Sequence, residues 1–314
     1  MKLATILLFA AVLAGLFAAC DSRPSTPAMC GSGGFAHNDN GKLHRPYQAL
    51  NMTMSSGEER MFLLRLPDGY DPDTPSDVVF NFHGAESNAH EQFVYGDFNA
   101  LADRDNIILV MPDANKVFPD RGHELATYWD AAWEGTKRVR DHDLRFVIEL
   151  VEKIQTEYCT GNFYAAGMSA GGDMTTALQC ATHGPFRAYA SVTYRYFDTE
   201  DCGNAVPKPM ISFHGTEDRI VPLEGLPAPW FDPHVDEIMQ SWANVNGCDA
   251  GVIEEAFTEN VTRYHWANCD ARIVWYLIEG GGHTWPGGSD PPTWGHTTQE
   301  ISASELIWSF FFDE

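Results

Sequence analysis

Apolar residues follow two spacings along the chain, and segments of the two kinds alternate. Short, nearly continuous apolar runs predict buried strands at residues 61–66, 78–82, 107–111, 162–166, 189–194, 210–213 and 273–278. Between them, apolar residues recur every three or four positions, which predicts helices at 144–158, 173–181, 235–245 and 301–312. Strands separated by amphipathic helices are typical of a mostly parallel sheet with helices on both faces, so the pattern predicts an α/β fold.

The start of the chain has a different composition from the rest. Lys2 is followed by a run to Ala19 that is apolar except for Thr5 and Gly15, so residues 1–19 are predicted to be a secretory signal peptide. Residues 20–45 are rich in Gly, Ser and Asn and are predicted to form a flexible tether. Residues 46–314 show no repeat and no second composition, so we expect them to form a single domain.

Cys20 directly follows the apolar run, in a sequence that resembles a bacterial lipobox. We therefore expect an exported protein, extracellular or periplasmic, with a lipid anchor on Cys20. Simple cleavage and release is the alternative. A lipid on Cys20 is the only membrane contact that the sequence predicts.

The chain carries a formal charge of −24 at pH 7. This charge repels nucleic acid and anionic membrane surfaces, so neither is an expected partner. It suits an exported protein that acts on a neutral or weakly charged substrate. The histidines match no metal-binding spacing, and neither His-Glu-x-x-His nor Cys-x-x-Cys occurs in the sequence. We therefore expect no metal and no cofactor.

A glycine-rich bend follows the strand predicted at 162–166. Its sequence is Gly-Met-Ser-Ala-Gly, residues 167–171. A serine on such a bend is held in a strained and exposed conformation, and the flanking glycines prevent collisions between a Cβ and the neighbouring backbone. The pattern indicates that Ser169 is a nucleophile for acyl transfer. An ordinary glycine-rich turn is the alternative.

The loop after the strand predicted at 210–213 supplies a carboxylate. Residues 213–218 read Phe-His-Gly-Thr-Glu-Asp. Asp218 lies just past the end of the strand, where active groups of open α/β sheets gather and where a carboxylate can orient an imidazole. Glu217 is its rival for this role, and a solvated acidic turn is the alternative.

His283 follows three glycines in the loop after the strand predicted at 273–278. Such a loop can fold the histidine back over the edge of the sheet, whereas the alternative is a surface histidine in a flexible loop. The order Ser169, Asp218, His283 is the chain order of the catalytic triad in α/β-hydrolases. The sequence therefore predicts this triad and an α/β-hydrolase fold.

A tight loop after the strand at 78–82 has the sequence Phe-His-Gly-Ala, residues 82–85. It can direct the backbone N–H of Ala85 at a developing oxyanion, with the N–H of Ala170 as the second donor. A plain strand-ending turn is the alternative. We also expect His83 and Trp285 to contact the substrate, with local packing as the alternative for Trp285.

From about Arg60 onward the chain resembles the secreted polyhydroxybutyrate depolymerases and feruloyl esterases of carbohydrate esterase family one. The resemblance rests on residues 81–84, 166–172, 213–218, 221–222, 246–248 and 280–288. The last of these contains His-Thr-Trp-Pro-Gly-Gly and is the most specific. The resemblance implies an α/β-hydrolase with Ser169 as nucleophile, Asp218 as acid, His283 as base and no metal. Residues 120–130 and 227–233 depart from the family and are expected to shape the substrate site.

The expected function is hydrolysis of carboxylic esters through an acyl-enzyme. A polyhydroxybutyrate-type oligomer or polyester is favoured, because the glycine-rich loop before His283 most resembles that branch. Feruloyl or acetyl esters on plant polysaccharide are the alternative, and a non-catalytic carbohydrate-binding lipoprotein is an alternative of another class. The catalytic core takes up nearly the whole chain, so we expect no large cap domain. The same catalytic groups could serve a peptidase, but a peptidase of this kind needs a domain that recognises the peptide terminus, and no residues are left to form one. For Trp129 and Trp133, packing is favoured over substrate binding.

Seven cysteines bear on the compartment, because an exported chain matures under oxidising conditions. Without Cys20, six remain, an even number that fits three disulfides; free buried thiols are the alternative. One pair flanks a short segment between a helix and a strand, and a second pair falls at the end of the sheet opposite Ser169. The predicted pairs are Cys248–Cys269, Cys159–Cys180 and, by elimination, Cys30–Cys202.

Overall fold

The computed structural model describes residues 47–114, 116–117, 127–129, 142–181, 184–194, 199, 202, 205–225, 234–289 and 294–312. The predicted signal peptide, the tether with Cys20 and Cys30, and Trp133 lie outside these residues. The loop predicted at 227–233 lies outside them entirely, and that at 120–130 almost entirely. In the described part of the chain, no helix combines the length and apolar character that a bilayer span requires.

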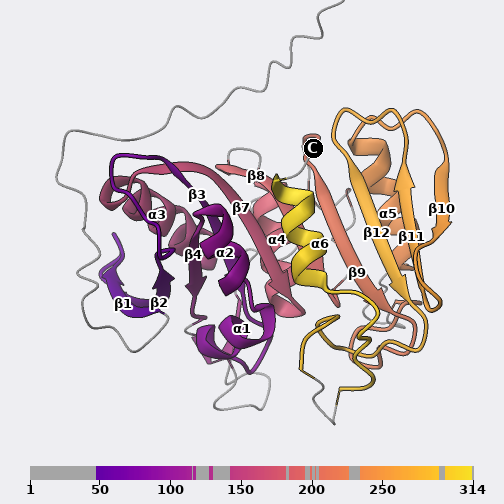
Figure 1. Cartoon of the computed structure of the whole chain (residues 1–314), viewed down its shortest axis with the longest axis horizontal. Coiled ribbons are helices and arrows are strands. Elements are labelled where there is room, and N and C mark those ends of the chain that lie inside the picture. Colours follow the sequence, from indigo (N-terminus) through magenta and orange to yellow (C-terminus); the bar gives the residue numbers. More distant parts are fainter. Residues whose placement is uncertain are drawn as a thin grey trace, which may run out of the picture.

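Ten strands of the described chain form one sheet, in the order β1-β2-β4-β3-β7-β8-β9-β12-β11-β10 (Figure 1). The six strands from β4 to β12 in this order run parallel, whereas the two strands at each edge make antiparallel pairings. The bounds are β1 Gln48–Thr53, β2 Glu59–Arg65, β3 Ser76–Phe82, β4 Ile108–Pro112, β7 Thr160–Met168, β8 Phe186–Val192, β9 Met210–Gly215, β10 Val252–Ala256, β11 Val261–Trp266 and β12 Ile273–Ile278. A separate small pair joins β5 Lys116–Val117 and β6 Thr127–Tyr128.

Helices cover both faces of the sheet, as the sequence predicts (Figure 1). Alternate residues of β3 show the reason: Val79 packs with α1, α2 and α6, whereas Val78 and Phe80 pack with α3 and α4 on the opposite face. The second of these faces continues into a cluster of α5 with β9 and β12. The bounds are α1 Ala89–Gly96, α2 Asn99–Asp105, α3 His142–Glu157, α4 Ala170–Cys180, α5 Val235–Val245 and α6 Ala303–Phe312. The mostly parallel sheet and its two helical layers confirm the predicted α/β-hydrolase architecture.

The topology places one crossing point at the centre of the molecule. From β3 the chain passes to β4 on one side and then returns to β7 on the other side of β3. Ligands of open α/β sheets bind at such a switch point, outside the carboxyl ends of the strands. The loops after β3 and β7, which hold residues 83–85 and Ser169, both start at this point.

The disulfides differ in part from the prediction. Cys248–Cys269 is confirmed, but Cys180 pairs with Cys202, so the predicted pairs Cys159–Cys180 and Cys30–Cys202 are wrong. The reason is the direction of α4, whose last turn leaves β7 and reaches β9: Gln179 donates to the sulfur of Met210. Cys159 instead lies beside β3, where its carbonyl accepts from Ser76 N–H, and it is disulfide-bonded as well. These bonds fit an oxidising compartment.

Removal of the Cys180–Cys202 bond gives a test of this connectivity. We expect Cys180→Ala/Cys202→Ala to lower the free energy of unfolding by roughly 2–4 kcal/mol, because the bond closes a loop in the unfolded chain. Urea denaturation measures the change. Cys248→Ala/Cys269→Ala is the matched control, because it removes a bond that closes a loop of nearly the same length. The sequence separation is 21 for this pair and 22 for Cys180–Cys202. A non-reducing peptide map that links Cys180 to Cys159 would contradict the arrangement.

Candidate active site

Ser169 sits between β7 and α4 in a conformation that few residues other than glycine adopt. Its φ is 54° and its ψ is −121°, and the side chain is half-buried at the start of α4. A Cβ on Gly167 would lie 2.2 Å from the carbonyl oxygen of Gly171, and a Cβ on Gly171 would lie 2.1 Å from that of Phe82. Both glycines are therefore required by close backbone approach, and together they impose the bend on Ser169.

Asp218 and His283 form the central contact of the site. His283 Nδ1 lies 2.8 Å from Asp218 Oδ2, and both side chains are almost completely buried. Asp218 Oδ1 accepts the N–H groups of Ile220 and Val221 at 2.9 and 2.8 Å. A carboxylate can only accept from an imidazole N–H, so Nδ1 carries the proton and Nε2 is left as the basic nitrogen. Between the described side chains of Ser169 and His283 there is no hydrogen bond, a contact that often tightens only with substrate.

Glu217, the rival of Asp218, has a different position. Its side chain is exposed, and its backbone N–H donates to the carbonyl of Gly281 at 2.9 Å. A Cβ on Gly215 would lie 2.2 Å from that same carbonyl oxygen. Glu217 thus joins the loop of the acid to the loop of the base through its backbone, and the carboxylate that reaches His283 belongs to Asp218.

A second segment holds the His283 loop in place, and sequence reasoning missed it. His283 N–H donates to the carbonyl of Trp294 at 2.7 Å, and Gly282 N–H donates to that of His296 at 2.9 Å. A Cβ on Gly282 would lie 2.5 Å from the Trp294 oxygen, so this pairing needs glycine. The one local signal was Gly295, which adopts a φ of 99°.

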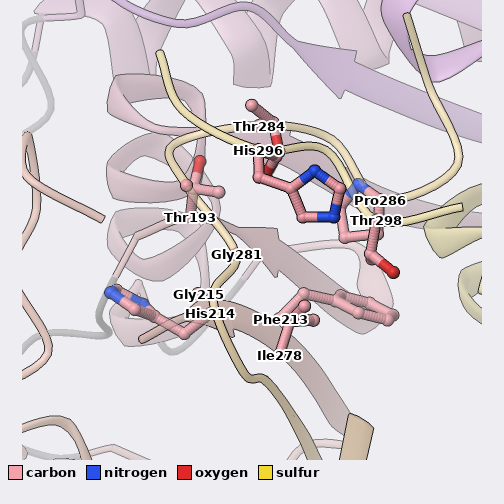
Figure 2. A pocket seen from close by; sticks show the side chains of 11 residues that line it. Thr193, Phe213, His214, Gly215, Ile278, Gly281, Thr284, Pro286, His296 and Thr298 are labelled. Carbon is pink, nitrogen blue, oxygen red and sulfur yellow. The ribbon is translucent and has the colours of Figure 1, made fainter. Parts of the chain in front are cut away.

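A small cavity lies beneath this pairing, with room for about one water molecule (Figure 2). Its wall comes from the ends of β9 and β12 and from the two paired segments, including Phe213, Ile278, Gly281 and His296. Neither Ser169 nor His283 lines it. The cavity therefore belongs to the packing that supports the His283 loop, and it is too small to hold an ester substrate.

The loop after β3 lies directly beside Ser169. A Cβ built on Gly84 would be 3.4 Å from the Cβ and 4.0 Å from the Oγ of Ser169. Among the described residues, no acceptor takes the backbone N–H of Ala85 or of Ala170. Ala170 is the first residue of α4, where a helix leaves its N–H groups without intrahelical partners. Two open N–H groups thus lie in the residues next to Ser169 and Gly84.

The two predicted substrate contacts are not supported by their surroundings. His83 and Trp285 have no exposed surface, so neither side chain can touch a substrate in this structure. Trp285 instead donates its indole N–H to Ser304 Oγ at 2.9 Å and packs on Phe98, which ties the His283 loop to α6 and α2. Trp129 is buried as well and donates to the carbonyl of His83 at 2.8 Å, so the packing interpretation of Trp129 is confirmed.

No group of three or more His, Cys, Asp or Glu side chains in the described ranges has the arrangement of a metal site. At the edge of the sheet that holds Ser169, the reactive groups described above are the serine hydroxyl, the His283–Asp218 pair and the open backbone N–H groups.

Two glycine substitutions test two separate roles: one glycine is needed for the stability of the fold, and the other for the access of substrate to Ser169. Gly84→Ala adds a methyl group in ordinary contact with Ser169, so we expect near-native thermal stability but a loss of ester hydrolysis on the order of 10-fold or more, because the methyl group crowds the reacting carbonyl. Gly171→Ala meets Phe82 O at 2.1 Å and should lower stability by about 1–3 kcal/mol. Melting curves and initial rates with p-nitrophenyl acetate test both. Unchanged activity in Gly84→Ala would argue against an approach of substrate over Gly84.

Comparison with known proteins agrees with this architecture. No protein-family model matches the chain. Feruloyl esterase C of Emericella nidulans is 29% identical over 175 residues, which cover 53% of this chain and 57% of that protein. The chain thus spans little more than half the length of this relative.

Two solved structures share the fold over most of both chains. The acetyl xylan esterase from Aspergillus awamori matches with a TM-score of 0.54 at 14% identity, over 76% of this chain and 94% of that one. The poly(3-hydroxybutyrate) depolymerase LpqC from Bordetella parapertussis matches with a TM-score of 0.53 at 17% identity, over 86% and 91%. The chain therefore has an α/β-hydrolase fold, with sequence similarity to a feruloyl esterase and a fold shared with an acetyl xylan esterase and a poly(3-hydroxybutyrate) depolymerase.

Proposed function

We propose that this chain is an exported serine esterase that hydrolyses carboxylic esters through an acyl-enzyme. The observation that carries the proposal is the buried Asp218–His283 pair at the same sheet edge as the strained Ser169. His283 Nε2 takes the proton of Ser169 as its Oγ attacks the ester carbonyl. The N–H groups of Ala85 and Ala170 bind the oxyanion of the tetrahedral intermediate.

The same groups complete the reaction. His283 gives its proton to the leaving alcohol, which leaves an acyl group on Ser169. A water molecule then loses a proton to His283, attacks the acyl carbonyl and releases the acid, and Ser169 regains its proton. Asp218 keeps the imidazole in the Nδ1–H tautomer through both halves of the cycle.

For the substrate, we propose an oligomer or polyester of the polyhydroxybutyrate type. The support is the glycine-rich loop before His283, together with the fold shared with a poly(3-hydroxybutyrate) depolymerase. Feruloyl or acetyl esters on polysaccharide are the second candidate, because a feruloyl esterase is a relative by sequence and an acetyl xylan esterase shares the fold. A net charge of −24 favours uncharged esters in both cases.

We also propose that the chain is exported through residues 1–19 and anchored by a lipid on Cys20. The disulfides support an oxidising compartment. A carbohydrate-binding protein without catalysis has less support, because a non-glycine residue with a φ of 54° costs about 1–3 kcal/mol and persists where the surrounding structure imposes it. Such strain at a serine that shares its sheet edge with a buried Asp218–His283 pair is expected of a nucleophile.

The triad assignment predicts a graded series of variants. Ser169→Ala should fold normally and lose about 10⁴-fold or more in kcat, because the nucleophile is gone. Asp218→Asn should lose somewhat less, and Glu217→Gln should stay near wild type because its side chain is exposed. Steady-state rates with p-nitrophenyl acetate and labelling by a fluorophosphonate measure the series. If Glu217→Gln were more damaging than Asp218→Asn, the acid would be misassigned.

The substrate proposal predicts a rank order among esters. Methyl ferulate, acetylated xylan, hydroxybutyrate oligomers and a long-chain triglyceride are compared at equal ester concentration by titration of the released acid. We expect hydroxybutyrate oligomers to turn over fastest and the triglyceride slowest. Faster turnover of methyl ferulate or acetylated xylan would assign the second candidate, and fastest turnover of the triglyceride would contradict both candidates. The Ser169→Ala variant supplies the background rate for each ester.

A further inference from the structure

His83 directly follows β3 and lies completely inside the protein. Each of its ring nitrogens makes one short contact with the backbone. Nε2 accepts the N–H of Ala114 at 2.9 Å, so this nitrogen carries no proton. Nδ1 lies 2.7 Å from the carbonyl oxygen of Gly84, which can only accept, so this nitrogen carries the proton. The two partners together assign the neutral Nδ1–H tautomer to His83.

The donated proton fixes one peptide plane. The carbonyl of Gly84 accepts from His83 Nδ1 and, at 3.4 Å, from the N–H of Ser87 in a turn. A trans peptide is planar, so its C=O and the following N–H point in opposite directions. The N–H of Ala85 therefore points away from the buried imidazole. Gly84 itself lies against Ser169, because a Cβ built on it would be 3.4 Å from the Cβ of that serine.

We infer that His83 is a positioning residue for the oxyanion hole. Its Nδ1–H holds the Gly84–Ala85 peptide with the Ala85 N–H directed at the carbonyl attacked by Ser169. The inference rests on the proposed esterase function and replaces the substrate contact that the sequence suggested for His83. The imidazole acts from behind the peptide and never touches the substrate.

The ring is itself held from several elements. The Trp129 ring packs on the imidazole at 5.0 Å between ring centroids, and the indole N–H donates to the backbone carbonyl of His83 at 2.8 Å. Asp113 Oδ1 lies 3.3 Å from Nε2 but accepts the N–H of Ala89 at 2.9 Å, at the start of α1. Arg60 of β2 donates to the carbonyl of Asp113 at 3.0 Å. Because these contacts leave the imidazole one orientation, the direction of the Gly84 carbonyl is preset before substrate binds.

Two amide substitutions separate the two hydrogen bonds of His83. In His83→Asn, the side-chain NH₂ reaches the position of Nδ1 and can still donate to Gly84 O. In His83→Gln, the longer amide reaches the position of Nε2 and can serve Ala114 N–H, but no donor remains at Gly84. The pair is matched in charge and polarity, and it differs in the bond that the inference requires.

We expect His83→Gln to lose about 10²-fold in kcat on p-nitrophenyl acetate, because an oxyanion donor that is misdirected loses most of its effect. KM should change by less than about threefold, and His83→Asn should stay within about tenfold of wild type in kcat. The acidic limb of the pH profile of kcat/KM should not move in either variant, since it reports on His283. Equal losses in both variants, or a loss carried by KM, would overturn the inference.

Rates are compared below the melting temperature of the less stable variant, so that folded protein is measured. A second test needs no variant to fold: ¹⁵N NMR of the imidazoles in the wild-type protein should show His83 protonated on Nδ1 and unprotonated on Nε2. A proton on Nε2 would overturn the inference. A wild-type protein that hydrolyses no ester would contradict the proposed function, whereas an active wild type with a fully active His83→Gln would contradict the role of His83 alone.

Discussion

The site depends on one place where two backbone segments cross without room for a side chain. At this crossing the first turn of α4 passes the end of β3, and a Cβ on Gly171 would lie 2.1 Å from Phe82 O and 2.7 Å from His83 O. The crossing forces the bend at Ser169, and it brings the loop of Gly84 against the serine. The proposed nucleophile and the proposed oxyanion loop are thus positioned by the same contact, so we expect neither to move without the other.

A similar contact builds the other half of the site. Gly215, at the end of β9, faces Gly281 so closely that a Cβ would lie 2.2 Å from its carbonyl oxygen. In each half a buried histidine is followed by a glycine, in the pairs His83-Gly84 and His214-Gly215. Each histidine contacts a carbonyl of the loop that follows: His83 that of Gly84, and His214 that of Val221 at 2.8 Å. Val221 in turn donates to Asp218, so His214 supports the acid much as His83 supports the oxyanion loop.

The sequence predicted elements whose residues are buried on both faces. The runs in β3 and β12 show continuous apolar character because helices cover both sides, and β12 and α5 have the predicted bounds. It missed β10, all of whose residues are exposed and therefore show no apolar run. It also missed the short helices α1 and α2, whose few buried positions give a weak periodic signal.

The residues of the site were predictable where motif and strand end coincide, as they do for Ser169, Asp218 and His283. The environment of an aromatic or a cysteine was not predictable in this way. Trp285 follows His283 by two residues in sequence, yet its ring points into the protein toward Ser304. Cys180 is close to Cys159 in the topology, but the tilt of α4 carries it toward Cys202. Such outcomes depend on the direction of a helix axis, which local sequence patterns do not specify.

The electrostatic design explains how this chemistry operates in so acidic a protein. In the proposed mechanism, positive charge develops on His283 and negative charge on the substrate oxygen during acyl transfer. The positive charge is matched by Asp218, whose other oxygen is already held by two backbone N–H groups, so the carboxylate is fixed before the reaction begins. The negative charge is assigned to backbone N–H groups, which carry no net charge. The arrangement therefore needs no cationic side chain at the site, and an uncharged ester can enter without opposing the net charge of −24.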